Sequence, residues 1–410
     1  MSDAPQAKTL GGVLRQRAFR TIWVAQFVSI FGDFLALFAV ISLITFRLHG
    51  TASDVALVCV AYMAPVAFVA PVGGVLVDRW PVRRVMIASD LIRAILAASL
   101  LLARTVPQIG LALAAIGFVS SFFGPAQSVA VRTVVATEDL LAANAMLSQA
   151  FYVVRIFSPA VAGALVAWLG ENSCFWLDTG SFLFSAAMIS TLSIVRPVSG
   201  RRDGSLRALG RDFLEGNGFI FTHRELSFAF LASAFAMFML SSFSPLISVY
   251  IRDTLGAGAL LYGAITAMVG VGLIVGTQTV RSAAKDRAMH VLVLAGLFLL
   301  ALGAALLGAF RFRTTAALST FTIGFAIAFV VVPAQTLSQR DTPPAMQGRV
   351  SSTFMALFSL AQVLGMLISG VLADHLGIRQ LFISCAATVA VLASAGYFLL
   401  RPRAQTRAAA

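Results

Sequence analysis

One acidic residue and one arginine lie deep inside strongly apolar stretches of the sequence. Asp33 is near the middle of an apolar segment at about 21–46, and Arg155 is near the middle of another at about 142–169. A charge at the centre of a membrane helix costs about 2.5–3.5 kcal/mol on insertion scales, so each should face a partner or a water-filled cavity. A carboxyl group in such a place can bind or release a proton. These two residues are the first candidates for proton- or substrate-responsive groups.

Three polar side chains accompany the two charges on the expected helix faces. Gln26 and Ser29 precede Asp33 by seven and four residues, and Tyr152 lies one turn before Arg155. Asp33 and Arg155 are each about 12–13 residues from the start of their segments, which is roughly 20 Å along a helix. Helices that begin at the same membrane face would therefore hold them at one depth.

The composition of the chain indicates the class of protein in which these residues lie. Apolar residues make up 59% of the 410 and charged residues only 11%, with a mean hydropathy of +0.91. Soluble chains carry roughly 25% charged residues, so a water-soluble or disordered chain is excluded. We predict an all-α polytopic membrane protein, since each apolar segment is about as long as a membrane span. The twelve segments are 21–46, 53–77, 85–104, 108–131, 142–169, 173–195, 226–251, 259–280, 288–310, 315–337, 350–373 and 378–400.

The longest polar stretch, residues 196–224, separates the first six segments from the last six. Helical spacing of apolar residues within it predicts an amphipathic helix on the membrane surface. The predicted organisation is an N-terminal tail, a six-helix bundle, a linker, a second six-helix bundle and a C-terminal tail, at 1–20, 21–195, 196–224, 225–400 and 401–410.

The two halves repeat one another in part. Pro-Ala-Gln-Ser at 125–128 ends the fourth segment, and Pro-Ala-Gln-Thr at 333–336 ends the tenth. Repeated six-helix halves are typical of transporters whose bundles rock about a central site. Gln127 and Gln335 are candidates for lining the transport path, although hydrogen bonding in the core explains them equally well.

The distribution of charge predicts the orientation. Loops and tails on the side of the termini hold 22 Lys and Arg residues, against 6 on the other side. Both termini should therefore be cytoplasmic, and the net charge of +13 needs no nucleic-acid partner. Three scattered cysteines indicate neither a disulfide framework nor a metal site. No cleavable signal peptide is visible at the N-terminus.

The loop after the second segment carries a long motif with Gly74, Asp78, Arg79, Arg83 and Arg84. It resembles the loop signature of the major facilitator superfamily, with Pro81 where that family usually has Gly. The resemblance implies two six-helix bundles and a conformational latch, in which Asp78 would meet the start of the eleventh helix near 348–351. A helix N-terminus favours such a carboxylate. The alternative is a basic loop that only sets topology.

Other segments resemble one branch of that superfamily, the bacterial drug exporters that include macrolide exporters. The segments are 25–33, 87–93, 213–216 and 347–350. The first of them, 25–33, is equally similar to lysophospholipid transporters. The resemblance makes the first and fifth helices neighbours, so we expect an ion pair between Asp33 and Arg155; a purely structural pair is the alternative. It also implies that the seventh helix lines the cavity, through Phe235 and Met239.

The remaining membrane acids are assigned to structure. Asp90 and Arg93 are spaced to satisfy each other on one helix. Asp178 and Asp374 are expected at solvated helix ends. Asp33 would then be the one acid near the middle of the membrane.

These features predict a secondary active transporter of hydrophobic or amphiphilic small molecules in the inner membrane, a proton-coupled exporter that acts as a monomer. A lysophospholipid transporter is the alternative within that class. A membrane-embedded lipid-modifying enzyme would need a nucleophile that the pair lacks, and a non-transporting receptor is a further alternative. There is no Gly-rich phosphate-binding loop, and we expect no cofactor, no metal and no catalytic residues. Protons and membrane lipids are the expected partners.

Overall fold

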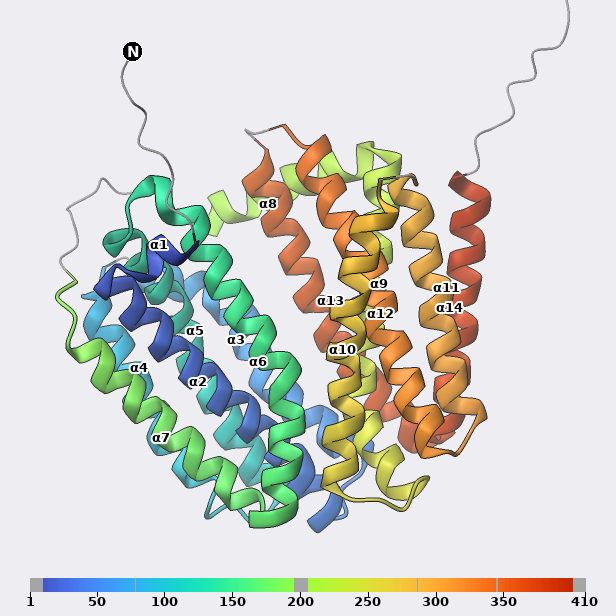
Figure 1. Ribbon diagram of the computed structural model, residues 1–410, viewed down its shortest axis with the longest axis horizontal. Helices are drawn as coiled ribbons and strands as arrows, with labels where there is room; N and C mark the ends of the chain where they lie inside the picture. The colour runs from blue at the N-terminus through green and yellow to red at the C-terminus, as the bar shows by residue number, and fades with distance from the viewer. Residues whose placement is uncertain (1–9, 78, 195–205, 286, 344–345, 401–410) are drawn as a thin grey trace, which may run out of the picture. The chain divides into compact units, whose positions relative to one another are not determined.

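The computed structural model describes residues 10–77, 79–194, 206–285, 287–343 and 346–400. Every regular element in these ranges is a helix (Figure 1). The first group of helices comprises α1 Leu10–Leu14, α2 Arg17–Ser42 with the π-helical turn η1 Leu43–Arg47, α3 Ala52–Val77, α4 Val82–Ser99, α5 Val106–Val134, the 3-10 turn η2 Thr137–Asp139, α6 Leu140–Leu169 and α7 Glu171–Ser190. The second group comprises α8 Leu206–Thr222, α9 Arg224–Asp253, α10 Ala259–Ala283, α11 Met289–Ala309, α12 Arg313–Asp341, α13 Gln347–Leu376 and α14 Ile378–Leu400.

The prediction of an all-helical polytopic membrane protein is confirmed. Each of the twelve apolar segments contains one long helix, and ten helices within the described ranges are long and apolar enough to cross a membrane. The two long helices outside that set are α4 and α7. They carry Asp90, Arg93 and Asp178.

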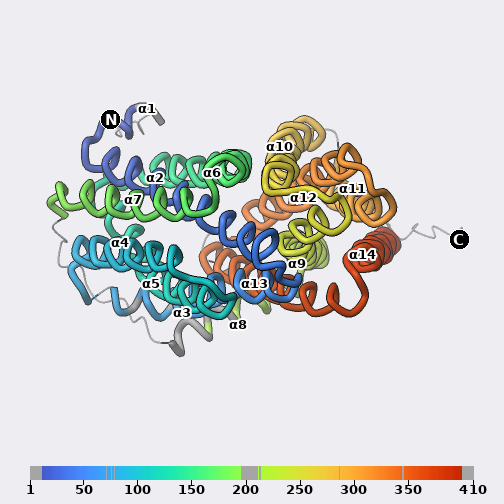
Figure 2. Tube along the Cα trace, turned by 90° about the horizontal axis from the view of Figure 1, so that it is seen from below, coloured from blue at the N-terminus to red at the C-terminus, as the bar shows by residue number. Residues whose placement is uncertain are grey.

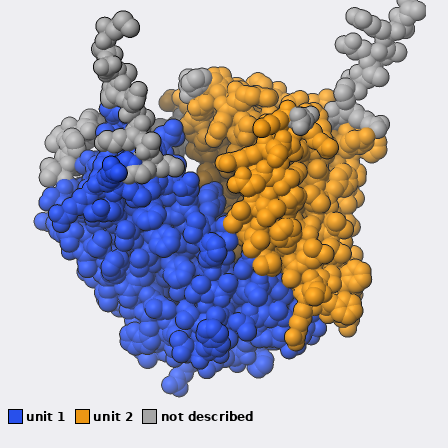
Figure 3. All heavy atoms as spheres, viewed as in Figure 1, with its two compact units in different colours: residues 1–208, 244–267 blue, residues 209–243, 268–410 orange. Residues whose placement is uncertain are grey.

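The chain forms two compact units, drawn in two colours in Figure 3. Unit 1 comprises residues 1–208 and 244–267, and unit 2 comprises residues 209–243 and 268–410. Helices α9 and α10 each contribute to both units, because the boundaries fall within them. The division that the sequence predicts at residues 196–224 remains a prediction.

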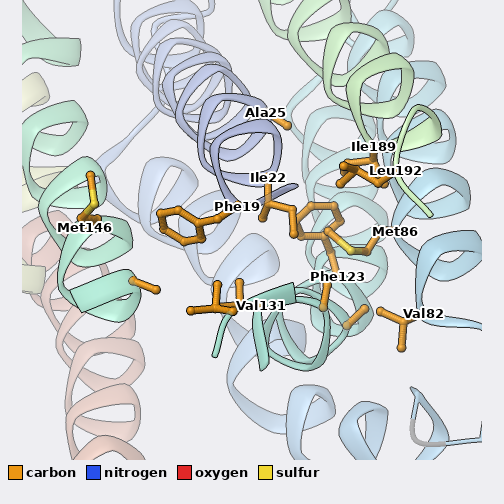
Figure 4. Close-up of a cluster of buried hydrophobic side chains, with 14 of the residues drawn as sticks. Phe19, Ile22, Ala25, Val82, Met86, Phe123, Val131, Met146, Ile189 and Leu192 are labelled. Carbon is orange, nitrogen blue, oxygen red and sulfur yellow. The ribbon is translucent and has the colours of Figure 1, made fainter. Parts of the chain in front are cut away.

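Helix α2 is the central element of unit 1. It packs against both α6 and α7, and α4 packs against α5 and α7. Figure 2 shows α2 beside α6 and α7 in the view from below. An apolar cluster joins one end of these helices (Figure 4); its members include Phe19, Ile22, Met86, Phe123, Met146 and Ile189. This core fixes the helix rotations that determine which side chains meet further along.

Helix α8 confirms that the polar linker contains a helix, while residues 195–205 lie outside the described ranges. Ile220 is buried in a cluster with residues of α9, α12 and α13 in unit 2, whereas Leu214 is 70% exposed. Glu215 pairs with Arg349 of α13 at 2.7 Å, and a hydrogen bond joins Ser242 of α9 to the Gly365 carbonyl of α13 at 3.0 Å. These contacts hold the linker helix and α9 to α13.

Candidate functional site

Arg93 is the centre of a buried ionic group in unit 1. Its guanidinium forms an ion pair and a hydrogen bond with Asp90 on the same helix, and lies 3.8 Å from Asp33 Oδ2 on α2. Asp90 is fully buried and Arg93 is only 3% exposed, while the Asp33 side chain retains 19% exposure. Asp33 is therefore the least buried of these three residues.

Aromatic rings hold the arginine in place. The Arg93 guanidinium carbon lies 4.4 Å from the ring centroid of Phe123 on α5 and 4.4 Å from that of Phe182 on α7. A cation between two aromatic faces gains electrostatic attraction that partly replaces lost hydration. The aromatic contacts and the carboxylates together explain why an arginine can occupy the interior of a helical membrane unit.

Asp178 on α7 is the third carboxyl group of this region. It is 1% exposed and lies beside Gly32, the residue that precedes Asp33 on α2. Gly32 allows the close approach of α2 and α7, since a Cβ there would lie 2.7 Å from Asp178 Oδ1. We name Asp33, Asp90, Asp178 and Arg93 the acid–arginine cluster.

The acid–arginine cluster contains more carboxyl groups than cations, and this determines its charge. The cluster contains three carboxyl groups and one guanidinium, which pairs with Asp33 and Asp90, so full ionisation would leave two uncompensated negative charges in a medium of low dielectric constant. Within the described residues, Asp90 Oδ2 and Arg93 Nε are buried without a hydrogen-bond partner. A proton bound to one of the carboxyl groups would reduce the charge and supply a hydrogen-bond donor. The arrangement is suited to binding and releasing protons.

Two expectations from the sequence are wrong here. Asp33 faces Arg93 rather than Arg155, which forms no ion pair within the described residues. Asp178 is a buried interior residue rather than a solvated helix end, so Asp33 is not the one interior acid. The predicted pairing of Asp90 with Arg93 is confirmed, and Asp374 is exposed as expected.

The other candidate residues are placed as follows. Ser29 is buried and Gln26 half-buried, and the Gln26 Oε1 atom has no hydrogen-bond partner in the described ranges. Tyr152 is 50% exposed. Gln127 is half-buried and Gln335 exposed. In unit 2, Met239 is 3% exposed and Phe235 stacks on Phe238 with ring centroids 6.0 Å apart. A lining role for these residues remains a prediction.

The latch motif is described only in part. Asp78 lies outside the described residues, so its expected contact near 348–351 remains a prediction. Gly74 is half-buried, and Arg79 and Arg84 are exposed. Arg83 donates a hydrogen bond to the Ser190 carbonyl at the end of α7. Cations are favoured at a helix C-terminus, so Arg83 ties α4 to α7.

The far end of unit 1 is held by a set of contacts that sequence reasoning missed. Arg252, at the end of α9, donates hydrogen bonds of 2.8 Å to the carbonyls of both Thr45 and Gly50. Thr45 also donates to Ser248 at 3.0 Å, and Tyr262 of α10 stacks on Phe38 with ring centroids 4.5 Å apart. The signal for Arg252 was its position in the last turn of α9, but its acceptors depend on the tertiary fold.

Comparisons with known sequences agree with this architecture. Residues 22–365 match the sequence profile of the Major Facilitator Superfamily. The chain is 27% identical over 384 residues to the uncharacterized MFS-type transporter YfiS of Bacillus subtilis, with 90% of each protein covered. It is 26% identical over 381 residues to macrolide efflux protein A of Streptococcus pyogenes, covering 89% of this chain and 91% of that protein. It is 24% identical over 368 residues to the multidrug efflux pump Tap of Mycolicibacterium fortuitum, covering 87% and 89%.

Solved structures show the same fold. The nucleoside transporter NupG aligns with a TM-score of 0.76 at 13% identity, over 94% of this chain and 100% of that one. A bacterial homolog of the human lysosomal transporter Spinster aligns with a TM-score of 0.70 at 13% identity, over 95% and 96%. The profile match spans most of the chain, and the relatives and the fold agree with it. The chain is a multi-pass membrane protein that belongs to the major facilitator superfamily of transporters.

Proposed function

We propose that this protein exports a hydrophobic or amphiphilic small molecule in exchange for protons, and that the acid–arginine cluster carries the coupling proton. The observation on which this rests is the cluster itself: Arg93 pairs with Asp90 and Asp33, Asp33 is its least buried member, and Asp178 is buried beside Gly32. Two relatives that match nearly the whole chain are described as a macrolide efflux protein and a multidrug efflux pump. Their descriptions support export as the direction of transport.

Proton exchange can follow from the pairing of Asp33 with Arg93, which is favourable only while the Asp33 carboxyl group is ionised. When Asp33 is ionised, its 3.8 Å contact with Arg93 is favourable. When Asp33 binds a proton, Arg93 retains Asp90 as a partner, and α2 is released from that contact. Because α2 also packs against α6, a change in protonation can alter the surface that α2 and α6 present to a substrate. A ligand and a proton would thereby compete without touching the same atom.

The orientation is also a proposal. We place both termini and residues 196–224 in the cytoplasm, the protein in the inner membrane, and the latch motif with Asp78 at the cytoplasmic ends of the helices. A cysteine introduced at Ser199 should resist an impermeant thiol reagent added outside intact cells, whereas one at Asn172 should react. Rapid labelling at Ser199 would contradict this orientation. We further propose a monomer whose partners are its substrate, protons and membrane lipids.

The test of coupling is transport in sealed vesicles that contain only the purified protein. A labelled macrolide should accumulate when a pH gradient is imposed, and Asp33→Asn and Asp178→Asn should each reduce accumulation to the level of empty vesicles. Asp374→Asn is the matched control, because Asp374 is exposed at the end of α13. Accumulation by both interior variants at the wild-type rate would refute the proposed role of the cluster.

A lysophospholipid is the second candidate substrate. The observation that favours it is Arg155, a cation that is exposed in the middle of α6 and unpaired within the described residues. A macrolide and a lysophospholipid share an apolar body but differ in charge. Transport measured with each at equal concentration will separate the two.

A further inference from the structure

Arg155 differs from every other interior charge of unit 1. It lies halfway along α6, it is exposed, and no hydrogen bond or ion pair joins it to any residue in the described ranges. Arginine is not deprotonated in proteins, so the charge remains. A helix that crosses a membrane therefore presents a permanent positive charge near its middle.

Polar residues precede Arg155 on one exposed face of α6. They follow at intervals of four, four and three residues: Asn144, Ser148, Tyr152 and Arg155. Such spacing aligns them in one stripe. The opposite face, with Ala143, Met146, Ala150 and Val154, is buried. Because a charge facing lipid is costly, this polar stripe favours an aqueous environment for Arg155.

Helix α10 covers α6 beyond Arg155. Ala162 lies seven residues further along the same face and is fully buried. At the next residue, Gly163, a Cβ would lie 2.9 Å from the Gly263 Cα and 3.0 Å from the Ala259 carbonyl oxygen, both in α10. The exposed polar face of α6 therefore ends shortly after Arg155.

No carboxylate at membrane depth is available to neutralise this charge. Of the interior acids of unit 1, Asp33 and Asp90 pair with Arg93, and Asp178 lies beside Gly32. In the sequence, none of the six apolar segments that follow residue 225 contains an Asp or a Glu. This holds for any arrangement of the two units, since it depends on sequence alone. The counter-charge of Arg155 must come from outside the protein.

We propose that the amphiphiles this protein transports include ones with a net negative charge, on a phosphate or carboxylate group, and that Arg155 binds that group. This deepens the proposed function and rests on it. The guanidinium can donate two parallel hydrogen bonds to such a group, and the Tyr152 hydroxyl lies one turn away on the same face. Phe151 packs edge-on against Phe34 of α2 with ring centroids 5.8 Å apart, so aromatic surface lies beside the arginine for the apolar part of the ligand.

Binding to the full-length protein in phosphatidylcholine nanodiscs tests the proposal. The anionic probes are lysophosphatidylglycerol, a lipid, and cholate, which is not a phospholipid. Lysophosphatidylcholine with the same acyl chain is the matched probe without net charge, and dodecyltrimethylammonium is the cationic probe. Wild type should bind at least one anionic probe more tightly than the probes without net negative charge, and Arg155→Gln should weaken that binding by about ten- to a hundredfold.

Two further variants control the result. Arg155→Lys keeps the charge but not the paired donors, so it should fall between wild type and Arg155→Gln. Arg132→Gln removes an exposed charge in the last turn of α5 and should bind as wild type does. Arg155→Gln should also unfold at the same temperature as wild type, which would show that the variant is folded.

Each outcome is decisive for the anion. If Arg155→Gln loses affinity only for lysophosphatidylglycerol, the group that Arg155 binds is a lipid headgroup. If it loses affinity only for cholate, that group belongs to an anion that is not a phospholipid. Equal affinity of wild type for all four probes, or unchanged anion binding by Arg155→Gln, overturns the proposal. If pH-gradient-driven macrolide transport persists in that case, the proposed export function stands and only the anionic substrate is refuted.

Discussion

Two arginines in unit 1 occupy the membrane interior under opposite conditions. Arg93 is buried, paired with Asp90 and Asp33, and enclosed by two aromatic rings. Arg155 is exposed and unpaired within the described residues. A charge with a built-in partner stabilises the fold and can respond to a proton, whereas a charge without one is available for a ligand. On the functions proposed above, coupling and recognition would reside on different helices of unit 1.

The largest effect is expected from removing the paired cation. Arg93→Gln would leave Asp90 and Asp178 buried without a positive partner, and removing one member of a buried pair costs about 3–5 kcal/mol. We expect the unfolding temperature of the purified protein to fall sharply. The double variant Arg93→Gln/Asp90→Asn should recover part of the loss, because one uncompensated acid is removed as well. A single variant as stable as wild type would show that the cluster does not hold the unit together.

A third arginine, Arg252, should give an intermediate effect. Its guanidinium bonds to the carbonyls of Thr45 and Gly50, and its side chain is 20% exposed. Hydrogen bonds from charged groups contribute about 1.5–3 kcal/mol, and water can replace part of these. Arg252→Gln should therefore lower stability by about 1–2 kcal/mol. If Arg252→Gln lowered the stability as much as Arg93→Gln does, the difference in burial between the two arginines would not determine the stability cost of removing them.

The smallest effect on stability is expected at Arg155. No partner within the described residues is lost in Arg155→Gln, and substitutions away from such contacts usually change stability by about 0.5 kcal/mol or less. The unfolding temperature should stay close to that of wild type while ligand binding changes. A destabilisation as large as that of Arg93→Gln would indicate that Arg155 has a structural partner, contrary to the comparison drawn here.

The sequence predicted the helices well because apolar segments of membrane length leave few alternatives. The roles that the sequence predicts for Asp33 on α2 and Arg155 on α6 remain predictions. The sequence did not predict which charges meet, because hydropathy does not fix the rotation of each helix about its axis. Asp33 and Arg155 match in depth, yet α2 turns Asp33 toward α4.

Asp178 shows a second limit. Its place near the predicted end of a segment favoured solvent exposure, whereas the fold buries it beside Gly32. Thr179, Ser181 and Ser185 follow it on α7 and are also buried. That concentration of polar residues was the signal that α7 carries an interior polar face. The sequence indicated that Arg93 pairs with Asp90, but it did not indicate the contacts of Arg93 with Asp33, Phe123 and Phe182.

The most direct test of the central claim is proton release from the purified protein. Wild type in weakly buffered solution with a pH-sensitive dye should release protons when a saturating macrolide or anionic amphiphile binds, since ligand and proton compete through Asp33. Asp33→Asn should bind the same ligand and release none, while Asp374→Asn should behave as wild type. Equal proton release by wild type and Asp33→Asn would contradict the account, because the proton would then reside elsewhere.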